Sequence, residues 1–217
     1  MSTLIIPTSF LGPVQLYAHI YAAEHTVEDR NEHFLKQTYR NRCYIASPTG
    51  PLALTVPIVR DNASHTPVRD IRLSDHGNWR HQHFNALVSA YENSPYFLYY
   101  ADDFAAVYEK SFTFLTDFNE ALHEVVLQCL SLDKKAEQAE AYVTAEACAA
   151  AGALDLRPVL TPKRPLSADN AFQPAPYWQV FASETGFLPN LSIVDLLFCM
   201  GPESRMVLKR SIAADEG

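Results

Sequence analysis

A short segment of the chain combines positive charge, amide groups and an aromatic ring. In order, it contains Lys36, Gln37, Tyr39, Arg40, Asn41 and Arg42. Guanidinium, amide and aromatic groups together recognise phosphates and sugars, because a guanidinium fork contacts two oxygens at once. We therefore interpret four of these residues as candidate substrate-binding residues, namely Lys36, Tyr39, Asn41 and Arg42. The alternative is a solvated loop without a ligand.

A single histidine is the first candidate for acid–base chemistry. His83 recurs at helical spacing with Trp79, Leu87 and Tyr91, so it points to the same apolar side as these residues. Imidazole titrates near neutral pH and therefore suits a general base or an orienting group at the edge of a pocket. The alternative is a core histidine that is hydrogen-bonded to a backbone carbonyl.

A carboxylate inside an apolar run is the second candidate catalytic group. Asp195 is flanked by Val194, Leu196 and Leu197, and an isolated buried charge is costly. We therefore expect a partner for it, with Arg42 or Lys36 as the candidate cations. The alternative is a structural ion pair or a helix cap.

A second mixture of aromatic and amide groups follows a proline-rich segment. Tyr177 and Gln179 are candidate substrate-binding residues there, and the alternative is that they are hydrophobic plugs under a loop. The segment before them, residues 153–177, is expected to be a long ordered loop or a lid, because it contains several prolines and no second core-sized segment follows it.

Several familiar sites are absent from the sequence. It contains no Gly-x-Gly-x-x-Gly, P-loop, Gly-x-Ser-x-Gly or His-Glu-x-x-His pattern. The four cysteines form no Cys-x-x-Cys pair, which argues against a zinc site or a disulfide framework. We predict no metal site, and the residues indicate no particular cofactor.

An α/β fold must position these side chains. Residues 4–6 and 25–29 are predicted strands on either side of a helix over residues 13–23, and residues 69–73 are a further predicted strand. The turn at residues 47–50 predicts a β-hairpin whose return strand covers residues 52–58. Helices are expected from residue 78 to Ser94, after Asp102, and over residues 111–130, 134–151 and 190–201, with residues 96–100 extended and residues 211–217 frayed.

Length, composition and net charge limit the number of domains and the classes of partner. The chain has 217 residues, 48% of them hydrophobic, and a formal net charge of −8, which favours one domain over residues 1–217 and argues against nucleic-acid binding. No long apolar run and no signal-peptide pattern are visible, so we expect a cytoplasmic protein without membrane insertion.

The motifs together resemble the WbqC-like family. The resemblance rests on residues 41–50 and 54–58, on the spacing of Trp79, His83 and Tyr91, and on the closing segment from Tyr177-x-Gln179 to Gly201. Members of this family are encoded near genes for O-antigen and other surface polysaccharides. The resemblance therefore implies a role in making or modifying an activated sugar. It also matches the family's polar positions to Lys36, Asn41, Arg42, His83, Gln179 and Asp195.

Two hypotheses follow. In the first, the protein is a sugar-modifying enzyme, such as a transferase, for which an activated sugar or an acyl donor is a small-molecule substrate. In the second, it is a noncatalytic binding or scaffold protein of a polysaccharide-assembly complex. Convergence of His83, Arg42 and Asp195 on one open cleft favours the first hypothesis. Separation of these residues in space, or their full burial with every partner group hydrogen-bonded, favours the second hypothesis. The donor, the acceptor and the oligomeric state stay open at this point.

Overall fold

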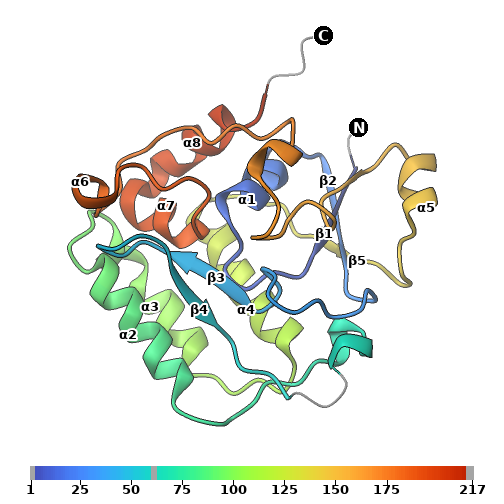
Figure 1. The fold of residues 1–217 in the computed structure, drawn as a ribbon, viewed down its shortest axis with the longest axis horizontal. Helices are drawn as coiled ribbons and strands as arrows, with labels where there is room; N and C mark the ends of the chain where they lie inside the picture. Colours follow the sequence, from blue (N-terminus) through green and yellow to red (C-terminus); the bar gives the residue numbers. More distant parts are fainter. Residues whose placement is uncertain (1–2, 60–62, 214–217) are drawn as a thin grey trace.

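A small parallel sheet lies on one side of the molecule. The computed structural model describes residues 3–59 and 63–213. Its sheet has the order β5-β2-β1-β6, formed by Glu137–Gln138, His25–Asp29, Thr3–Pro7 and Leu154–Asp155, and all of its pairings are parallel. The helix α1 (Val14–Ala22) connects β1 to β2 (Figure 1). Leu4, Ile5 and Ile6 are buried, as is usual for a central parallel strand.

The predicted β-hairpin is present and forms a sheet of its own, with a return strand that is shorter than the predicted 52–58. Strands β3 (Arg42–Ile45) and β4 (Leu52–Thr55) are antiparallel, and Arg42 pairs with Thr55 at the open end. At the turn, the Ser47 and Gly50 backbones exchange two hydrogen bonds of 3.1 Å. Gly50 has φ +114°, a value that an L side chain rarely adopts. The turn therefore explains the glycine, and it fixes the hairpin register.

Helices pack around the hairpin and cover the rest of the core. The longer ones are α2 (Trp79–Tyr91), α3 (Phe97–Tyr108), α4 (Leu115–Cys129), α7 (Ile193–Met200) and α8 (Ser204–Arg210). Shorter helices are α5 (Ala145–Ala150) and α6 (Ala182–Thr185), with 3-10 turns η1 (Ala63–His65), η2 (Val68–Asp70), η3 (Leu166–Ala168) and η4 (Gly201–Glu203). Figure 1 shows the hairpin on the side of α2 and α3, away from β1 and β2.

One hydrophobic core joins these elements into a single compact domain. Phe198 of α7 contacts the rings of Tyr91, Phe97 and Phe104 at centroid distances of 5.1–5.5 Å. The start of α7 also contacts the hairpin, because the Ser192 amide donates to the Tyr44 carbonyl over 2.7 Å. The start of α7 therefore lies beside strand β3 of the hairpin.

The structure corrects three local predictions. The helix expected over residues 134–151 is instead strand β5, a loop and the short α5, because pairing of Glu137 with Val27 outweighs the helix propensity of an Ala- and Glu-rich segment. Residues 69–73 form the η2 turn and single bridges rather than a strand. Residues 97–100 are the first turn of α3 rather than an extended segment. Residues 214–217 lie outside the described part.

The proline-rich segment 153–177 partly pairs with the sheet. Its first residues form β6 beside β1, which the sequence analysis does not anticipate. Further along, the Asp169 carboxylate accepts hydrogen bonds of 2.7 Å from Gln15 and lies 2.7 Å from His19 Nε2, both on α1. Phe172 forms a bridge with Ile212. The segment therefore contacts β1, α1 and the residues after α8 at successive points along its length.

The described residues contain neither a membrane-spanning helix nor a metal-binding cluster. None of the helices in residues 3–59 and 63–213 is long and apolar enough to cross a membrane. Within the same residues, no three His, Cys, Asp or Glu side chains converge in a way that would hold a metal ion.

Candidate functional site

A groove at the open end of the hairpin brings together three of the predicted substrate-binding residues. Its volume is about 380 Å³, and its lining comprises Phe34, Lys36, Gln37, Asn41, Arg42, Thr55, Val56, Pro57 and Ile58. We call it the hairpin groove. The Asn41 side-chain amide donates to the Val56 carbonyl over 2.9 Å, and the Val56 amide donates to the Asn41 carbonyl over 2.8 Å. Asn41 therefore extends the hairpin pairing and fixes the floor of the groove.

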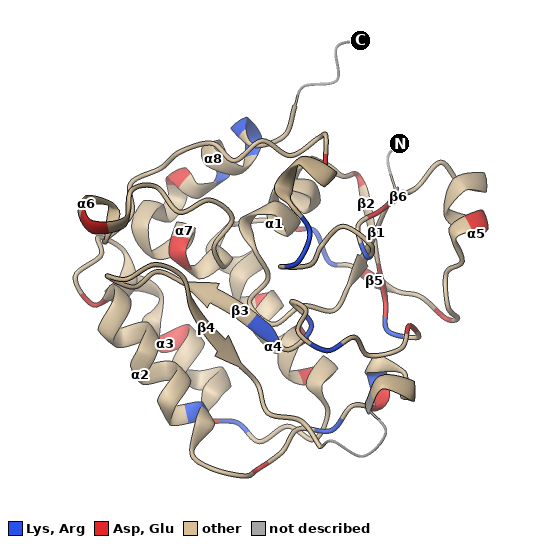
Figure 2. Cartoon of the chain, in the orientation of Figure 1, with Lys and Arg blue, Asp and Glu red and all other residues tan. Residues whose placement is uncertain are grey.

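Two cations of the hairpin groove have no acidic partner among the described residues. Arg42 is half-buried, and its Nε donates to Thr55 Oγ1 over 3.0 Å, while Lys36 is exposed. Figure 2 shows Lys and Arg positions at the start of β3 and along the loop that precedes it. In a chain of net charge −8, two cations without a counter-charge favour an anion at this place.

The neighbouring cation has a different role. Arg40 is almost fully buried, and its guanidinium forms a two-point pair with Glu32, with N–O distances of 2.8 and 2.5 Å. It is therefore neither a solvated loop residue nor available to a ligand. The Tyr39 ring is also buried, edge-on to Tyr44 at 6.4 Å, and is absent from the groove lining.

Gln37 is a groove residue to which the sequence analysis assigns no role. Its φ is +59°, in the left-handed region that favours glycine. Such a conformation costs on the order of 1 kcal/mol and is often kept at ligand-binding sites. No sequence pattern predicts this backbone angle. Only the position of Gln37 between Lys36 and Asn41 indicates that the residue belongs to the groove.

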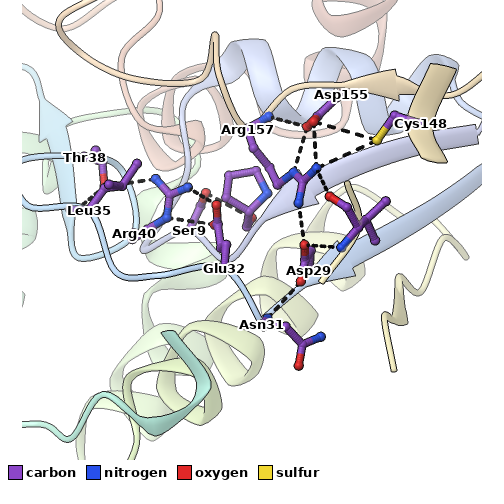
Figure 3. A network of polar contacts seen from close by, with 12 residues as sticks. Ser9, Asp29, Asn31, Glu32, Leu35, Thr38, Arg40, Cys148, Asp155 and Arg157 are labelled. Atoms are coloured by element: carbon purple, nitrogen blue, oxygen red, sulfur yellow. Dashed lines mark hydrogen bonds and ion pairs between the residues drawn. The ribbon is translucent and has the colours of Figure 1, made fainter. Parts of the chain in front are cut away.

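Figure 3 shows a larger ion-pair network that neighbours the Arg40 pair. Arg157, just after β6, donates to Asp29 at the end of β2, to both oxygens of Asp155 at 2.9 and 2.7 Å, and to the Val143 carbonyl at 2.6 Å. Asp29 is 0% exposed. These contacts join the 153–177 segment to the carboxyl end of the sheet. Ionic groups so far apart in sequence give no local pattern that would predict their pairing.

His83 lies directly behind the hairpin groove rather than in its lining. The ring is 7% exposed, packs against Trp79, Phe10 and Tyr108 at centroid distances of 5.2, 5.7 and 6.4 Å, and makes a backbone hydrogen bond with Thr55. Its Nδ1 is buried and has no hydrogen-bond partner among the described residues. Thr55 thus links the two predicted residues, because its side chain contacts Arg42 and its backbone contacts His83.

Asp195 lies in a buried cluster of neutral groups. Its carboxylate accepts hydrogen bonds from Tyr91 (2.8 Å), Tyr177 (2.6 Å) and Gln179 Nε2 (2.9 Å), and it is 0% exposed. The expected pairing with a cation of the 36–42 loop is therefore wrong. Three neutral donors satisfy the carboxylate instead, and burial raises its pKa above the usual range.

The predicted residues thus separate into two groups. Lys36, Asn41 and Arg42 line the hairpin groove, and His83 contacts it through Thr55. Tyr177, Gln179 and Asp195 form the buried cluster, in which Gln179 also exchanges hydrogen bonds of 2.8 and 2.9 Å with the Leu188 backbone. The cluster residues line none of the groove.

A protein-family model matches most of this chain. The model of the WbqC-like protein family matches residues 9–171. The chain belongs to the WbqC-like protein family. No curated protein and no solved structure matches the chain. The match covers the hairpin groove and His83 of this WbqC-like protein, whereas Tyr177, Gln179 and Asp195 lie beyond its end.

Two histidines of this WbqC-like protein with lowered pKa values predict acid sensitivity. Burial lowers the pKa of His83 to about 4, and burial likewise lowers the pKa of His123 on α4 to about 4. The unfolded chain, with an ordinary histidine pKa of about 6.5, therefore binds more protons between these values. The contribution of these histidines to the free energy of unfolding is then fully present above about pH 6.5 and is lost as the pH drops toward 4. His83 alone should account for about 2 kcal/mol between pH 7.5 and 5.

Urea unfolding at pH 7.5 and pH 5 measures this loss. The His83→Gln variant should lose less stability over that interval than the unmodified protein, while His81→Gln, on the exposed side of α2, should lose as much. Equal pH dependence in His83→Gln and the unmodified protein would show that folding does not lower the pKa of His83.

Proposed function

We propose that this WbqC-like protein binds the anionic part of an activated sugar in the hairpin groove and acts as a sugar-modifying transferase. Its place would be the biosynthesis of surface polysaccharides such as O-antigen, in the cytoplasm. The observation that carries the proposal is the pair of cations in the groove, Lys36 and Arg42, that lack an acidic partner among the described residues.

The chemistry of the groove suits a phosphate-linked sugar. The Arg42 Nε is held by Thr55 Oγ1, which leaves the two terminal nitrogens of the guanidinium to contact two phosphate oxygens. Lys36 adds a mobile positive charge at the rim. The apolar side chains of Val56, Pro57 and Ile58 supply a wall. The volume of about 380 Å³ lies in the range of small-molecule sites.

His83 has a supporting role in this proposal. It contacts Thr55 from behind the groove and is absent from the lining. It therefore orients β4, whose Thr55 side chain accepts the hydrogen bond from Arg42. The transfer reaction would then depend on groups of the ligand and of the groove that lie close together when the ligand is bound. Arg42 and Lys36 would stabilise negative charge on the leaving group.

A noncatalytic binding or scaffold role is the second candidate, and the Asp195 cluster favours it. Asp195 is fully buried and its partners Tyr91, Tyr177 and Gln179 satisfy it, so this carboxylate has the environment of a structural group. Binding of the same anionic ligand without turnover would support this candidate.

Conservative replacement of Arg42 tests the proposed binding. Arg42→Lys keeps the charge but loses the two-point fork, and we expect it to weaken binding of a nucleotide sugar about tenfold, with a larger loss in Arg42→Gln. Isothermal titration calorimetry over a panel of nucleotide sugars and acyl donors measures the affinities, with inorganic pyrophosphate as the simplest anionic probe.

Arg164→Lys is the matched control, because Arg164 is exposed and lies outside the groove lining. It should bind like the unmodified protein. Equal affinity in Arg42→Lys, Arg42→Gln and the unmodified protein would remove Arg42 from the site and reject the proposal.

A further inference from the structure

A second, smaller cavity lies at the carboxyl ends of β1 and β2, under α4. It has a volume of about 40 Å³, and its wall includes Thr8 and Ser9 after β1 and Asn119 and His123 of α4. It shares no lining residue with the hairpin groove. In open α/β sheets, ligands bind preferentially at the carboxyl ends of the strands.

One buried acceptor in this wall has no hydrogen-bond partner within residues 3–59 and 63–213. Asn119 is 1% exposed, and its Nδ2 donates to the Arg40 carbonyl over 2.8 Å and to Thr8 Oγ1 over 3.2 Å. A carbonyl can only accept, so the nitrogen must face Arg40 and the amide cannot be flipped. The Asn119 Oδ1 is then a buried acceptor without a hydrogen bond, which costs about 1–3 kcal/mol unless something donates to it.

One buried ring nitrogen in the same wall also has no hydrogen-bond partner in the described part of the chain. His123 Nδ1 lies 3.0 Å from the Tyr17 hydroxyl, while Nε2 is buried without a hydrogen bond. Burial lowers the pKa of His123 to about 4, so the ring is neutral at pH 7. The direction of the Tyr17–His123 hydrogen bond depends on the ring tautomer. In the tautomer whose Nδ1 accepts from the phenol, the ring proton lies on Nε2, which is then an unused donor.

The charges around the cavity disfavour an anion. Arg30 already pairs with Glu28 and Glu120, at N–O distances of 2.6 and 3.3 Å. Glu124 and Lys135 complete the charged part of the wall. Three carboxylates thus face two cations, the reverse of the balance in the hairpin groove.

Size and hydrogen bonding then define the ligand group. A water needs about 10–15 Å³ by the same measure, so a cavity of about 40 Å³ admits only a small end group. A hydroxyl both donates and accepts, which matches an acceptor on Asn119 and a donor on His123. Ile6, Leu16 and Leu127 give the cavity apolar sides that suit the carbon bearing such a hydroxyl.

We propose that this cavity is a second binding site, which takes the hydroxymethyl or hydroxyl end of a neutral polyol. The ligand hydroxyl donates to Asn119 Oδ1 and accepts from His123 Nε2. The site does not depend on the function proposed for the hairpin groove, because its residues and its preferred ligand charge are different.

Nuclear magnetic resonance of the intact protein tests this site without any substitution. Ethylene glycol, glycerol and a methyl glucoside are titrated into nitrogen-15-labelled protein, and the His123 ring and Asn119 side-chain amide signals are followed. We expect these signals to shift saturably with the polyols. The exposed ring of His81 should not shift, and inorganic phosphate should leave the His123 and Asn119 signals unchanged.

Two variants separate this site from the hairpin groove. His123→Phe keeps an aromatic ring but removes Nε2, and it should weaken polyol binding about tenfold or more, with the Asn119 amide signal as the readout. Arg42→Gln should leave polyol binding unchanged. The folded state of each variant is checked by its amide spectrum.

Several results would overturn the proposal. Unchanged His123 and Asn119 signals at every polyol concentration would mean that the cavity holds water only. An equal response to phosphate, or a stronger one to methylammonium, would reject a neutral ligand. Full polyol binding by a folded His123→Phe would exclude His123 from the site. None of these results affects the anion binding tested with Arg42.

Discussion

Replacement of Arg157 with methionine is expected to lower the free energy of unfolding by about 3–5 kcal/mol, because it leaves buried charge without a partner. The guanidinium is the cation that faces Asp29, which is 0% exposed, and it also holds Asp155 and the Val143 carbonyl. Methionine fills similar volume, so the loss reflects charge and hydrogen bonding more than a cavity. Urea unfolding at pH 7.5 measures it.

A matched control and a double variant sharpen this expectation. Arg164→Met makes the same change at an exposed position of the same segment and should cost less than about 0.5 kcal/mol. Asp29→Asn combined with Arg157→Met should cost clearly less than the sum of the single changes, because the double variant leaves no stranded charge. A loss in Arg157→Met as small as that in Arg164→Met would contradict the structural role of the network.

Replacement of Asp195 with asparagine is expected to cost about 2–4 kcal/mol, since the new amide must place a donor where the carboxylate accepts. Tyr177 and Gln179 share one oxygen, and Tyr91 donates to the other while accepting from the Ala46 amide over 3.0 Å. Either orientation of the asparagine therefore disrupts a bond that links α7 to α2, the hairpin or the 177–179 segment. Thermal and urea unfolding measure the loss.

Double-mutant cycles distinguish the neutral partners of Asp195 from the cation that the sequence suggested. Asp195→Asn with Tyr177→Phe should be strongly non-additive, because the two groups are bonded. Asp195→Asn with Arg42→Gln should be additive within about 0.5 kcal/mol. A coupling energy of more than about 1 kcal/mol in the second cycle would mean that Arg42 and Asp195 interact after all.

The separation of the two groups of predicted residues has a functional consequence. Arg42 and Lys36 are available in an open groove, so their replacement should change ligand affinity with little effect on stability. Tyr177, Gln179 and Asp195 are engaged with one another, so their replacement should change stability first. Comparing both quantities for the two groups shows which residues act on a ligand and which maintain the fold.

Local patterns in the sequence were sufficient for the elements with strong periodicity or clear turns. The apolar run at residues 4–6, the turn at Gly50 and the stripe along residues 111–130 predicted β1, the hairpin and α4. Such patterns succeed because neighbours in sequence determine them. The position of Lys36, Asn41 and Arg42 beside the hairpin followed from the same local order.

Other features depended on partners that are distant in the chain. Residues 134–151 have helix-forming composition, yet two of them form strand β5 because they pair with β2. Arg40 and Arg42 have the same side chain two positions apart, but Glu32 and burial make only Arg40 structural. Asp195 needed a partner on physical grounds, and the tertiary structure decided that three neutral donors fill that role.

The sequence by itself therefore determined the α/β class, the hairpin, the family resemblance and the position of a cationic loop beside the hairpin, because each of these depends on residue order over short distances. The tertiary structure alone decided which polar groups are satisfied and which are free. That division follows from physics: the free energy of a buried charge or hydrogen bond depends on the few groups that surround it, and folding brings these together from any part of the chain.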